Sequence, residues 1–166
     1  AEIDAAGIKT ELIQIGGKAL RGCVACMSCA KKQNHKCAIT SDDMNKYIKK
    51  ALEADIIILG SPTYFADVSA EMKALIDRLG FVSRTNGSLL KDKIGASVVA
   101  VRRGGATHAF DSINHLFQIS SMIIVGSTYW NFAVGREKGE VLNDKEGLEN
   151  MVDLGKRIAW LAKKIK

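Results

Sequence analysis

The sequence predicts an α/β fold with a parallel β-sheet, because strand and helix patterns alternate along the chain. Two segments, DIIILG at 55–60 and ASVVAVR at 96–102, are continuous apolar runs, which is typical of strands buried on both faces of a sheet. A third run, SMIIVG at 121–126, has the same character. The chain has 166 residues, enough to bury a proper core, and we expect a single domain over residues 1–166.

The helices are indicated by apolar spacing and by the residues at their first turns. Ser41 opens SDDMNKYIKKALEA, whose apolar residues recur at helical intervals and whose acids lie where the helix dipole favours them. Ser69 opens SAEMKALIDRLG, a helix that we expect to end at Gly80. Further helices are expected near 108–119 and, after an irregular stretch to about 145, up to Lys166.

The first residues predict an incomplete sheet. The segment AEIDAAGIK resembles the end of a helix with Gly7 at its terminus, and ELIQI at 11–15 has the pattern of a short strand. A helix that leads into a parallel strand normally follows an earlier strand in a βαβ unit. We therefore expect the working protein to have an N-terminal strand that this chain lacks.

Composition and charge exclude several classes of protein. Apolar residues make up 47% of the chain, but no apolar run reaches the roughly 18 residues of a membrane span. We see no secretory signal and expect a reducing, cytoplasmic location, which disfavours disulfides. The net charge is +6, and much of it lies at KK (49–50), RR (102–103) and the closing KKIK. These clusters are either solvated helix faces or a source of attraction for an anionic cofactor. No basic stripe is interleaved with aromatic residues, so we expect neither a nucleic-acid nor a membrane partner.

All the thiols of the chain lie within one short segment. Cys23, Cys26, Cys29 and Cys37 follow the spacing C-x2-C-x2-C-x7-C. Zinc sites usually combine two separated ligand pairs, whereas three thiols at x2 intervals and a looser fourth resemble the run that holds a cubane cluster in bacterial ferredoxins. Free or redox-active thiols, and zinc with His35 as an additional ligand, stay open as alternatives.

Three unusual loops follow predicted strands and therefore share the carboxyl edge of the sheet, where ligands of open parallel sheets bind. The loop GGKALRGCVACMSC carries three of the thiols. SPTYFADVS is either a turn before a helix or an aromatic-walled loop for a planar cofactor. RRGGATH is either a flexible turn or a site where Gly104 and Gly105 permit close backbone approach and Arg102 or Arg103 supplies charge.

The segment ADIIILGSPTYFADVSAEMKALIDR resembles the second flavin loop of the NADPH-dependent FMN reductase group of flavodoxin-like proteins, and the resemblance extends over about residues 1–130. It implies a flavodoxin-like doubly wound parallel sheet of order 2-1-3-4-5, here without its first strand. The phosphate loop of that family has no counterpart in this chain, so we expect the chain alone to bind FMN poorly or not at all. The implied flavin-binding residues are Ser61, Pro62, Thr63, Tyr64 and Phe65, followed by the loop of Arg102, Arg103, Gly104 and Gly105, which departs from the Gly-Gly-Gln-Glu form common in the family.

The iron–sulfur flavoprotein branch of the same family carries a compact four-cysteine motif, and the match at Cys23, Cys26, Cys29 and Cys37 implies a 4Fe–4S cluster. Since a flavin accepts electrons in pairs and a cluster passes them singly, we expect an oxidoreductase that needs no acid or base side chain. Electrons would pass between ferredoxin or NAD(P)H, the latter docking transiently, and a quinone or oxygen species.

Two other functions stay open, namely a cluster-free NAD(P)H-dependent FMN or quinone reductase and a non-catalytic thiol redox sensor or electron carrier. The resemblance also implies a homodimer or homotetramer. Outside these motifs, we expect Trp130 in the core and His108 and His115 as surface or packing residues.

Overall fold

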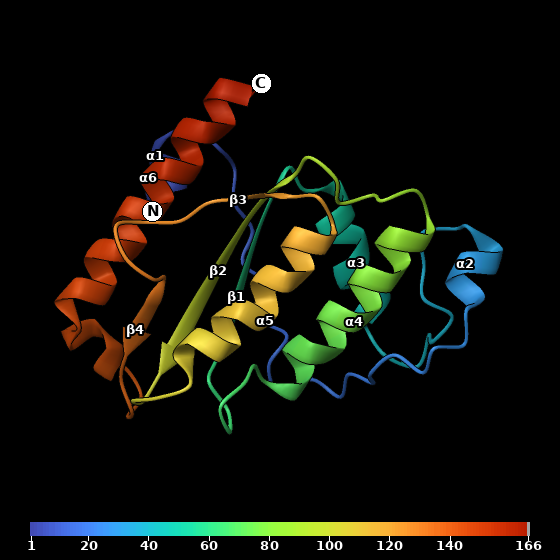
Figure 1. Cartoon of the computed structure of the whole chain (residues 1–166), viewed down its shortest axis with the longest axis horizontal. Helices are drawn as coiled ribbons and strands as arrows, with labels where there is room; N and C mark the ends of the chain where they lie inside the picture. Colours follow the sequence, from blue (N-terminus) through green and yellow to red (C-terminus); the bar gives the residue numbers. More distant parts are fainter. Residues whose placement is uncertain (166) are drawn as a thin grey trace.

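The computed structural model describes residues 1–165 and contains one parallel β-sheet (Figure 1). Strand β1 (Ile56–Pro62) pairs with β2 (Ile94–Val101), with Ile56 opposite Ile94. Two short strands share the other edge of β2: β3 (Ile123–Ile124) pairs with its first residues and β4 (Phe132–Val134) with its last. All strands are parallel, as the apolar runs at 55–60, 96–102 and 121–126 predict, and β1, β2 and β4 end at the same edge of the sheet, whereas β3 ends beside the first residues of β2.

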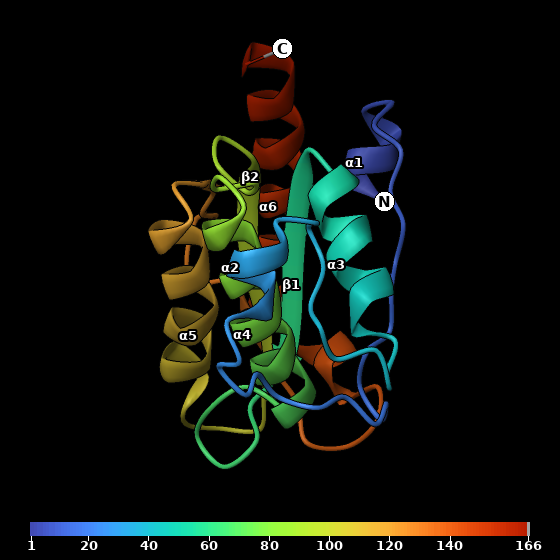
Figure 2. The same ribbon diagram turned by 90° about the vertical axis from the view of Figure 1, so that its right-hand side faces the viewer.

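Helices cover both faces of the sheet (Figures 1 and 2). One apolar core lies between the sheet and α3 (Met44–Glu53), α4 (Ala70–Thr85) and α5 (Ala106–Ile119). A smaller core on the opposite face contains residues of α1 (Glu2–Ala5) and α6 (Lys145–Ile165), and a short 3-10 helix, η1 (Glu140–Asn143), precedes α6. The predicted end of the last helix at Lys166 lies outside the described residues. This layered α/β arrangement confirms the predicted fold class.

The predicted strand at 11–15 is wrong, since residues 8–15 have no regular secondary structure and Leu12 is 98% exposed. A strand is stabilised by the ladder that it forms with a neighbour. In the expected order this segment pairs with the first strand and not with β1, and the described part of the chain contains no such strand. The sheet therefore contains the 3-4-5 portion of the expected order, and its fifth strand is divided into β3 and the unpredicted β4.

Helix α4 is longer than predicted, and it begins directly after the predicted flavin loop SPTYFADVS at 61–69. Ser69 caps its first turn as expected, with its hydroxyl accepting a hydrogen bond from the Met72 amide at 3.3 Å. Gly80 does not end the helix. A Cβ atom at Gly80 would lie 2.9 Å from Cδ1 of Leu116, so the glycine instead permits the close approach of α4 to α5.

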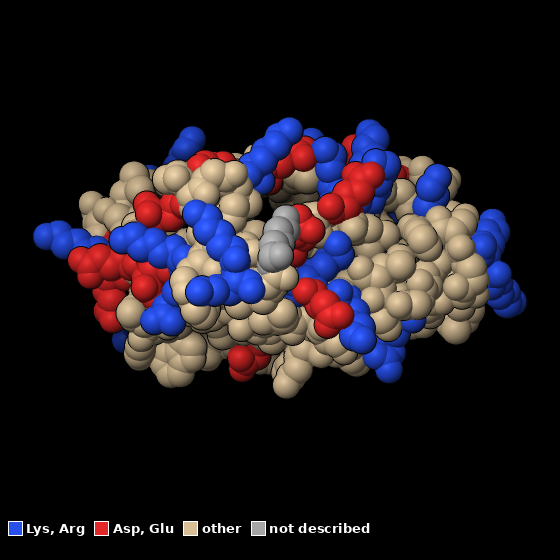
Figure 3. All heavy atoms as spheres, turned by 90° about the horizontal axis from the view of Figure 1, so that it is seen from above, with Lys and Arg blue, Asp and Glu red and all other residues tan. Residues whose placement is uncertain are grey.

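Some of the basic residues outside the predicted site are paired with acids. Lys49 pairs with Glu53, and Lys50 pairs with Glu11 at 2.7 Å. Figure 3 shows lysines and arginines interspersed with acidic residues on one face of the molecule. The KK pair at 49–50 is thus a solvated helix face. Within residues 1–165, no helix is both long enough and apolar enough to cross a membrane.

Candidate functional site

The loop after β1 forms an exposed aromatic turn, which we define as residues 63–67. Its first amide, that of Thr63, donates to the carbonyl of Ala100 on β2 at 2.8 Å. Tyr64 and Asp67 then exchange two backbone hydrogen bonds, while Phe65 and Ala66 adopt positive φ angles of 45° and 73°. This is the geometry of a tight two-residue hairpin. It leaves the ring of Phe65 fully exposed and that of Tyr64 largely exposed at the carboxyl edge of the sheet.

The loop after β2 lies directly against the aromatic turn. Gly105 has a φ of 88°, and a Cβ atom there would lie 3.0 Å from Cα of Ala66 and 3.1 Å from Cγ2 of Thr63. Only glycine fits both this conformation and this distance. The structure therefore brings together the two loops that the sequence singled out separately.

Asp67 ties the aromatic turn to α5 and was missed by the sequence analysis. Its carboxylate accepts a hydrogen bond from the Ser112 hydroxyl at 2.7 Å and lies 3.4 Å from Nε2 of His108. Partial burial raises the pKa of this carboxyl. The hydrogen bonds from Ser112 and the Val68 amide, together with the neighbouring His108, outweigh that effect and lower the pKa overall. His108 is an exposed surface residue as expected, although it takes part in this contact.

The other predicted flavin-binding residues differ in how far they are already engaged. Ser61 is buried, and its hydroxyl donates to the Pro62 carbonyl at 2.8 Å and accepts from the Ser69 amide at 3.0 Å. Among the described residues, the buried Thr63 hydroxyl oxygen has no hydrogen-bond partner. Arg102 and Arg103 are exposed, and neither forms an ion pair with a described residue. Free cations, exposed rings and an unsatisfied hydroxyl fit a planar, anionic cofactor.

The cysteines line a single pocket, which we call the cysteine pocket. Its walls are the loop at 23–29, the segment 37–39, and Arg78, Phe81 and Val82 of α4. All four thiols are free; Cys29 and Cys37 are half-buried, and Cys23 and Cys26 are exposed. Left-handed backbone conformations at Ala25 and Met27 curl the chain between the cysteines. The structure thus gathers the predicted ligands around one space.

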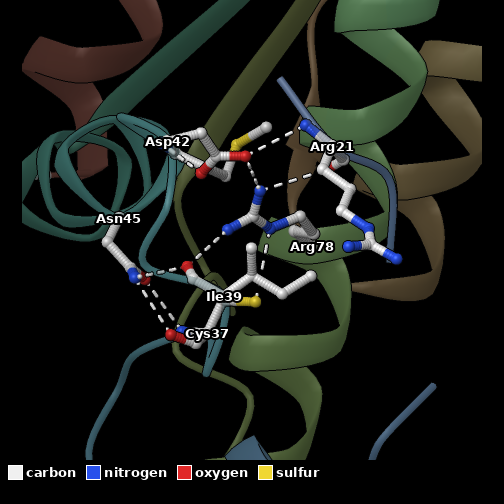
Figure 4. A network of polar contacts seen from close by, with 7 residues as sticks. Arg21, Cys37, Ile39, Asp42, Asn45 and Arg78 are labelled. Atoms are coloured by element: carbon white, nitrogen blue, oxygen red, sulfur yellow. Dashed lines mark hydrogen bonds and ion pairs between the residues drawn. The ribbon is translucent and has the colours of Figure 1, made fainter. Parts of the chain in front are cut away.

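A buried arginine organises this pocket (Figure 4). The side chain of Arg78 is 0% exposed, and its Nε donates to Sγ of Cys37 at 3.3 Å. Its other nitrogens donate to the carbonyl oxygens of Arg21 at 3.0 Å and Ile39 at 2.9 Å, and to Oδ2 of Asp42 at 2.6 Å. Burial raises the pKa of Asp42, but hydrogen bonds from Arg78 and from the amides of Arg21 and Met44 outweigh it and lower that pKa overall.

Two asparagines fix the backbone beside the thiols. Asn45 of α3 accepts from the Cys37 amide at 2.8 Å and donates to the Cys37 carbonyl at 2.9 Å. Asn86, at the end of α4, accepts from the His35 amide at 3.1 Å and donates to the Cys29 carbonyl at 3.3 Å. The two half-buried thiols are therefore held from both sides of the pocket.

The four free thiols are the type of ligand that a cubane cluster takes. In the part of the chain that the structure describes, no three His, Cys, Asp or Glu side chains converge closely enough to hold one metal ion, as tetrahedral zinc requires. A cubane cluster instead takes one thiolate at each of four irons, so its ligands are spread around a larger centre. Hydrogen bonding between Cys26 and the hydroxyl and amide of Ser28, with Lys31 nearby, lowers the pKa of the Cys26 thiol.

The sequence analysis expected the thiols beside the predicted flavin loop, but the cysteine pocket lies away from that loop. It lies along α4, from Arg78 onward, whereas the aromatic turn adjoins the start of that helix at Ser69. Nine residues of helix separate Ser69 from Arg78, which is about 14 Å along the axis. Short α2 (Ser28–Lys32), which carries Cys29, packs on the later turns of α4 (Figure 2).

Two further findings correct or extend the sequence analysis. Trp130 is not in the core: it is 48% exposed and stacks on Phe132. The residues that organise the cysteine pocket, Arg78, Asp42, Asn45 and Asn86, were all missed. One signal was available for Arg78, because it lies three residues after Leu75 on the apolar stripe of its helix, where an unpaired charge is costly.

The parallel sheet with its carboxyl-edge loops defines a flavodoxin-like fold. A solved flavodoxin from the domain Archaea has the same fold, with a TM-score of 0.57 at 16% identity, and the match covers 98% of this chain and 83% of that one. The sequence profile described as NADPH-dependent FMN reductase matches residues 1–137. The chain belongs to this family.

Two relatives are similar over nearly the whole chain, and both are described as iron–sulfur flavoproteins. One, from Methanocaldococcus jannaschii, is 42% identical over 169 aligned residues, covering 96% of this chain and 84% of the relative. The other, from Archaeoglobus fulgidus, is 30% identical over 177 aligned residues, covering 99% and 86%.

Proposed function

We propose that this protein is an FMN-dependent oxidoreductase that also holds a 4Fe–4S cluster on Cys23, Cys26, Cys29 and Cys37. The observation that carries the proposal is that the four free thiols line one pocket whose wall includes the buried cation of Arg78. The similarity to relatives described as iron–sulfur flavoproteins supports it. Together the two groups would supply conversion between paired and single electron transfer.

The aromatic turn and the glycine loop are the proposed FMN site. In this proposal the rings of Tyr64 and Phe65, together with Ser61, Pro62 and Thr63, would contact the flavin ring. The close contact at Gly105 keeps the two loops at a fixed separation, and Gly104 leaves the neighbouring backbone open. Arg102 and Arg103 supply positive charge toward an anionic cofactor.

The residues around the cysteine pocket act by binding and orienting. Arg78, Asn45 and Asn86 fix Cys37 and Cys29, while the exposed Cys23 and Cys26 close over the space from the solvent side. The proposed donor is ferredoxin or NAD(P)H and the proposed acceptor a quinone or oxygen species, in a cytoplasmic homodimer or homotetramer.

The test is to purify the protein without oxygen from cells that express the complete reading frame, and to measure iron, acid-labile sulfide and the visible spectrum. We expect flavin bands together with about four irons and four sulfides per chain. Cys29→Ser and Cys37→Ser should lose the iron. The matched control is His35→Asn, which also tolerates the left-handed backbone at that position and should keep it, whereas a zinc site using His35 would not.

A cluster-free NAD(P)H-dependent FMN or quinone reductase is the second candidate, because two of the four thiols are exposed to solvent. Flavin bands without iron, together with steady NAD(P)H oxidation, would establish this function. A colourless protein whose thiol count changes with oxidant would instead indicate the sensor or carrier function.

A further inference from the structure

We propose that Arg78 is a positioning residue that fixes Cys37 and raises the reduction potential of the cluster, with Asp42 as the opposing charge. The inference rests on the proposed function and adds to it a side chain that controls the electron affinity of the cysteine pocket. It is carried by the hydrogen bond from Nε of Arg78 to Sγ of Cys37 and by the complete burial of the guanidinium.

The geometry assigns Arg78 to the pocket and not to general packing. A guanidinium has five N–H donors in a fixed plane, and here they reach four acceptors on three separate parts of the chain. Those parts are Arg21 before the first thiol, the Cys37–Ile39 segment, and Asp42 before α3. One rigid side chain therefore sets the position of Cys37 relative to the rest of the cysteine loop.

Cys37, Cys23 and Cys26 differ in the hydrogen bonds that their sulfur atoms form. Cys37 accepts from a cationic side chain at 3.3 Å, whereas Cys23 is contacted by a backbone amide, that of Ala25, at 3.4 Å. Cys26 lies 3.5 Å from the Ser28 hydroxyl. Charge-assisted hydrogen bonds are about twice as strong as neutral ones, so the ligand at Cys37 has the strongest electrostatic environment of these three.

This environment favours the reduced state. Reduction adds one negative charge to a cluster, and hydrogen bonds and net charge around the sulfurs set its potential. The guanidinium keeps its proton at all ordinary pH values, so it is a permanent cation in a site of low dielectric. Asp42, 2.6 Å from Nη1 and 5% exposed, offsets part of that charge. Removing Arg78 and removing the charge of Asp42 must therefore shift the potential in opposite directions.

The experiment is a potentiometric titration with dithionite, without oxygen, of holoprotein from the complete reading frame, following the cluster by electron paramagnetic resonance. We expect Arg78→Met to lower the equilibrium constant for one-electron reduction about tenfold, a shift of about 59 mV to more negative potential. Arg78→Lys keeps the charge and should shift less. Asp42→Asn should shift the potential to more positive values.

The matched control is Arg84→Met, which removes the same charge from the same helix at an exposed position, where Arg84 donates to the Ile119 carbonyl. Its potential should equal that of the original protein. A purely structural Arg78 would change iron content but not potential. Equal potentials for the original protein, Arg78→Lys and Arg78→Met at full iron content overturn the inference, as does a negative shift in Asp42→Asn.

If Arg78→Met fails to fold, Arg78→Lys and Asp42→Asn decide by the sign and order of their shifts. Iron absent from the original protein rejects the proposed function itself, and this inference with it. Iron present with unshifted potentials rejects only the role of Arg78.

Discussion

The two regions that the chain offers to cofactors are built in opposite ways. In the aromatic turn, the rings of Tyr64 and Phe65 face solvent. In the cysteine pocket, by contrast, Arg78 is buried and its bonds reach thiol, carbonyl and carboxylate groups from three parts of the chain. The turn is shaped by its backbone, and the pocket by a side-chain network.

The difference fits what each region is proposed to bind. A planar cofactor is held by stacking and backbone contacts on rigid elements, so exposed rings on a tight turn suffice. A cluster needs several thiolates held in place at once, and the segment 23–37 that carries the thiols has only the short helix α2 as regular structure. Side chains of α3 and α4 supply the missing rigidity, at the expense of burying a charge pair.

The largest effect is expected from Asp42→Asn. Removing one member of a buried ion pair leaves the other charge unpaired, which costs about 3–5 kcal/mol of unfolding free energy. Urea unfolding measures the loss. The control is Asp77→Asn, which breaks the partly exposed pair with Lys73 on the same helix as Arg78 and should cost less than about 1 kcal/mol. Equal losses in the two variants would contradict a special role for the buried pair.

The pH dependence of stability should follow the same pair. Bonds from Arg78 and neighbouring amides overcome burial and lower the pKa of Asp42 in the folded state. A carboxyl with a depressed pKa stabilises the fold fully above its unfolded pKa, near 3.9, and loses that contribution as pH falls through the folded pKa. Stability should therefore fall with acid below about pH 4 in the original protein. Asp42→Asn should lack this part of the slope; identical slopes would exclude Asp42 as its source.

A smaller effect is expected in the glycine loop. Gly105→Ala forces an L-residue into the left-handed conformation, which costs about 1–2 kcal/mol, and pushes its Cβ against Ala66 and Thr63. The proposed flavin loops should then separate, so FMN affinity measured by fluorescence quenching should fall. Gly126→Ala is the control, because Gly126 lies outside the proposed FMN site, no atom lies within 4 Å of its Cβ position and its φ is not left-handed. If both variants bind FMN equally, the contact between the loops does not matter for binding.

Loss of the Asn45 hydrogen bonds to the Cys37 backbone should have an effect comparable to or smaller than that of Gly105→Ala. Asn45→Ala removes bonds to the amide and carbonyl of Cys37, and a lost hydrogen bond with a neutral partner typically costs about 1 kcal/mol. We expect weaker iron retention on exposure to a chelator with FMN affinity unchanged. The control is Asn34→Ala, whose side chain accepts from the Lys36 amide on the exposed surface. Loss of FMN without loss of iron would contradict the assignment of Asn45 to the cysteine pocket.

The comparison also shows what the sequence could predict. The sheet and its carboxyl-edge loops follow from apolar runs and turn residues, because strand burial and turn chemistry are local properties. The spacing of the thiols likewise predicted a shared site at Cys23–Cys37. The network of Arg78, Asp42 and Asn45 joins positions far apart in the chain, and no local pattern encodes those contacts. The strand at 11–15 failed for a related reason, since its formation depends on a neighbour and not on its own alternation.

The smallest effect on stability, and the sharpest contrast with Asp42, is expected for Phe65→Ala. The ring is fully exposed, so its loss should change the unfolding free energy by less than about 0.5 kcal/mol. Stacking of aromatic rings contributes about 0.5–1.5 kcal/mol, so FMN affinity should fall about two- to tenfold if Phe65 covers the flavin. Leu142→Ala, on the exposed side of η1, is the control and should alter neither quantity. A stable Phe65→Ala protein with unchanged FMN affinity would remove the ring from the proposed site, while a destabilised one would show that the aromatic turn, like the cysteine pocket, depends on its side chains for its shape.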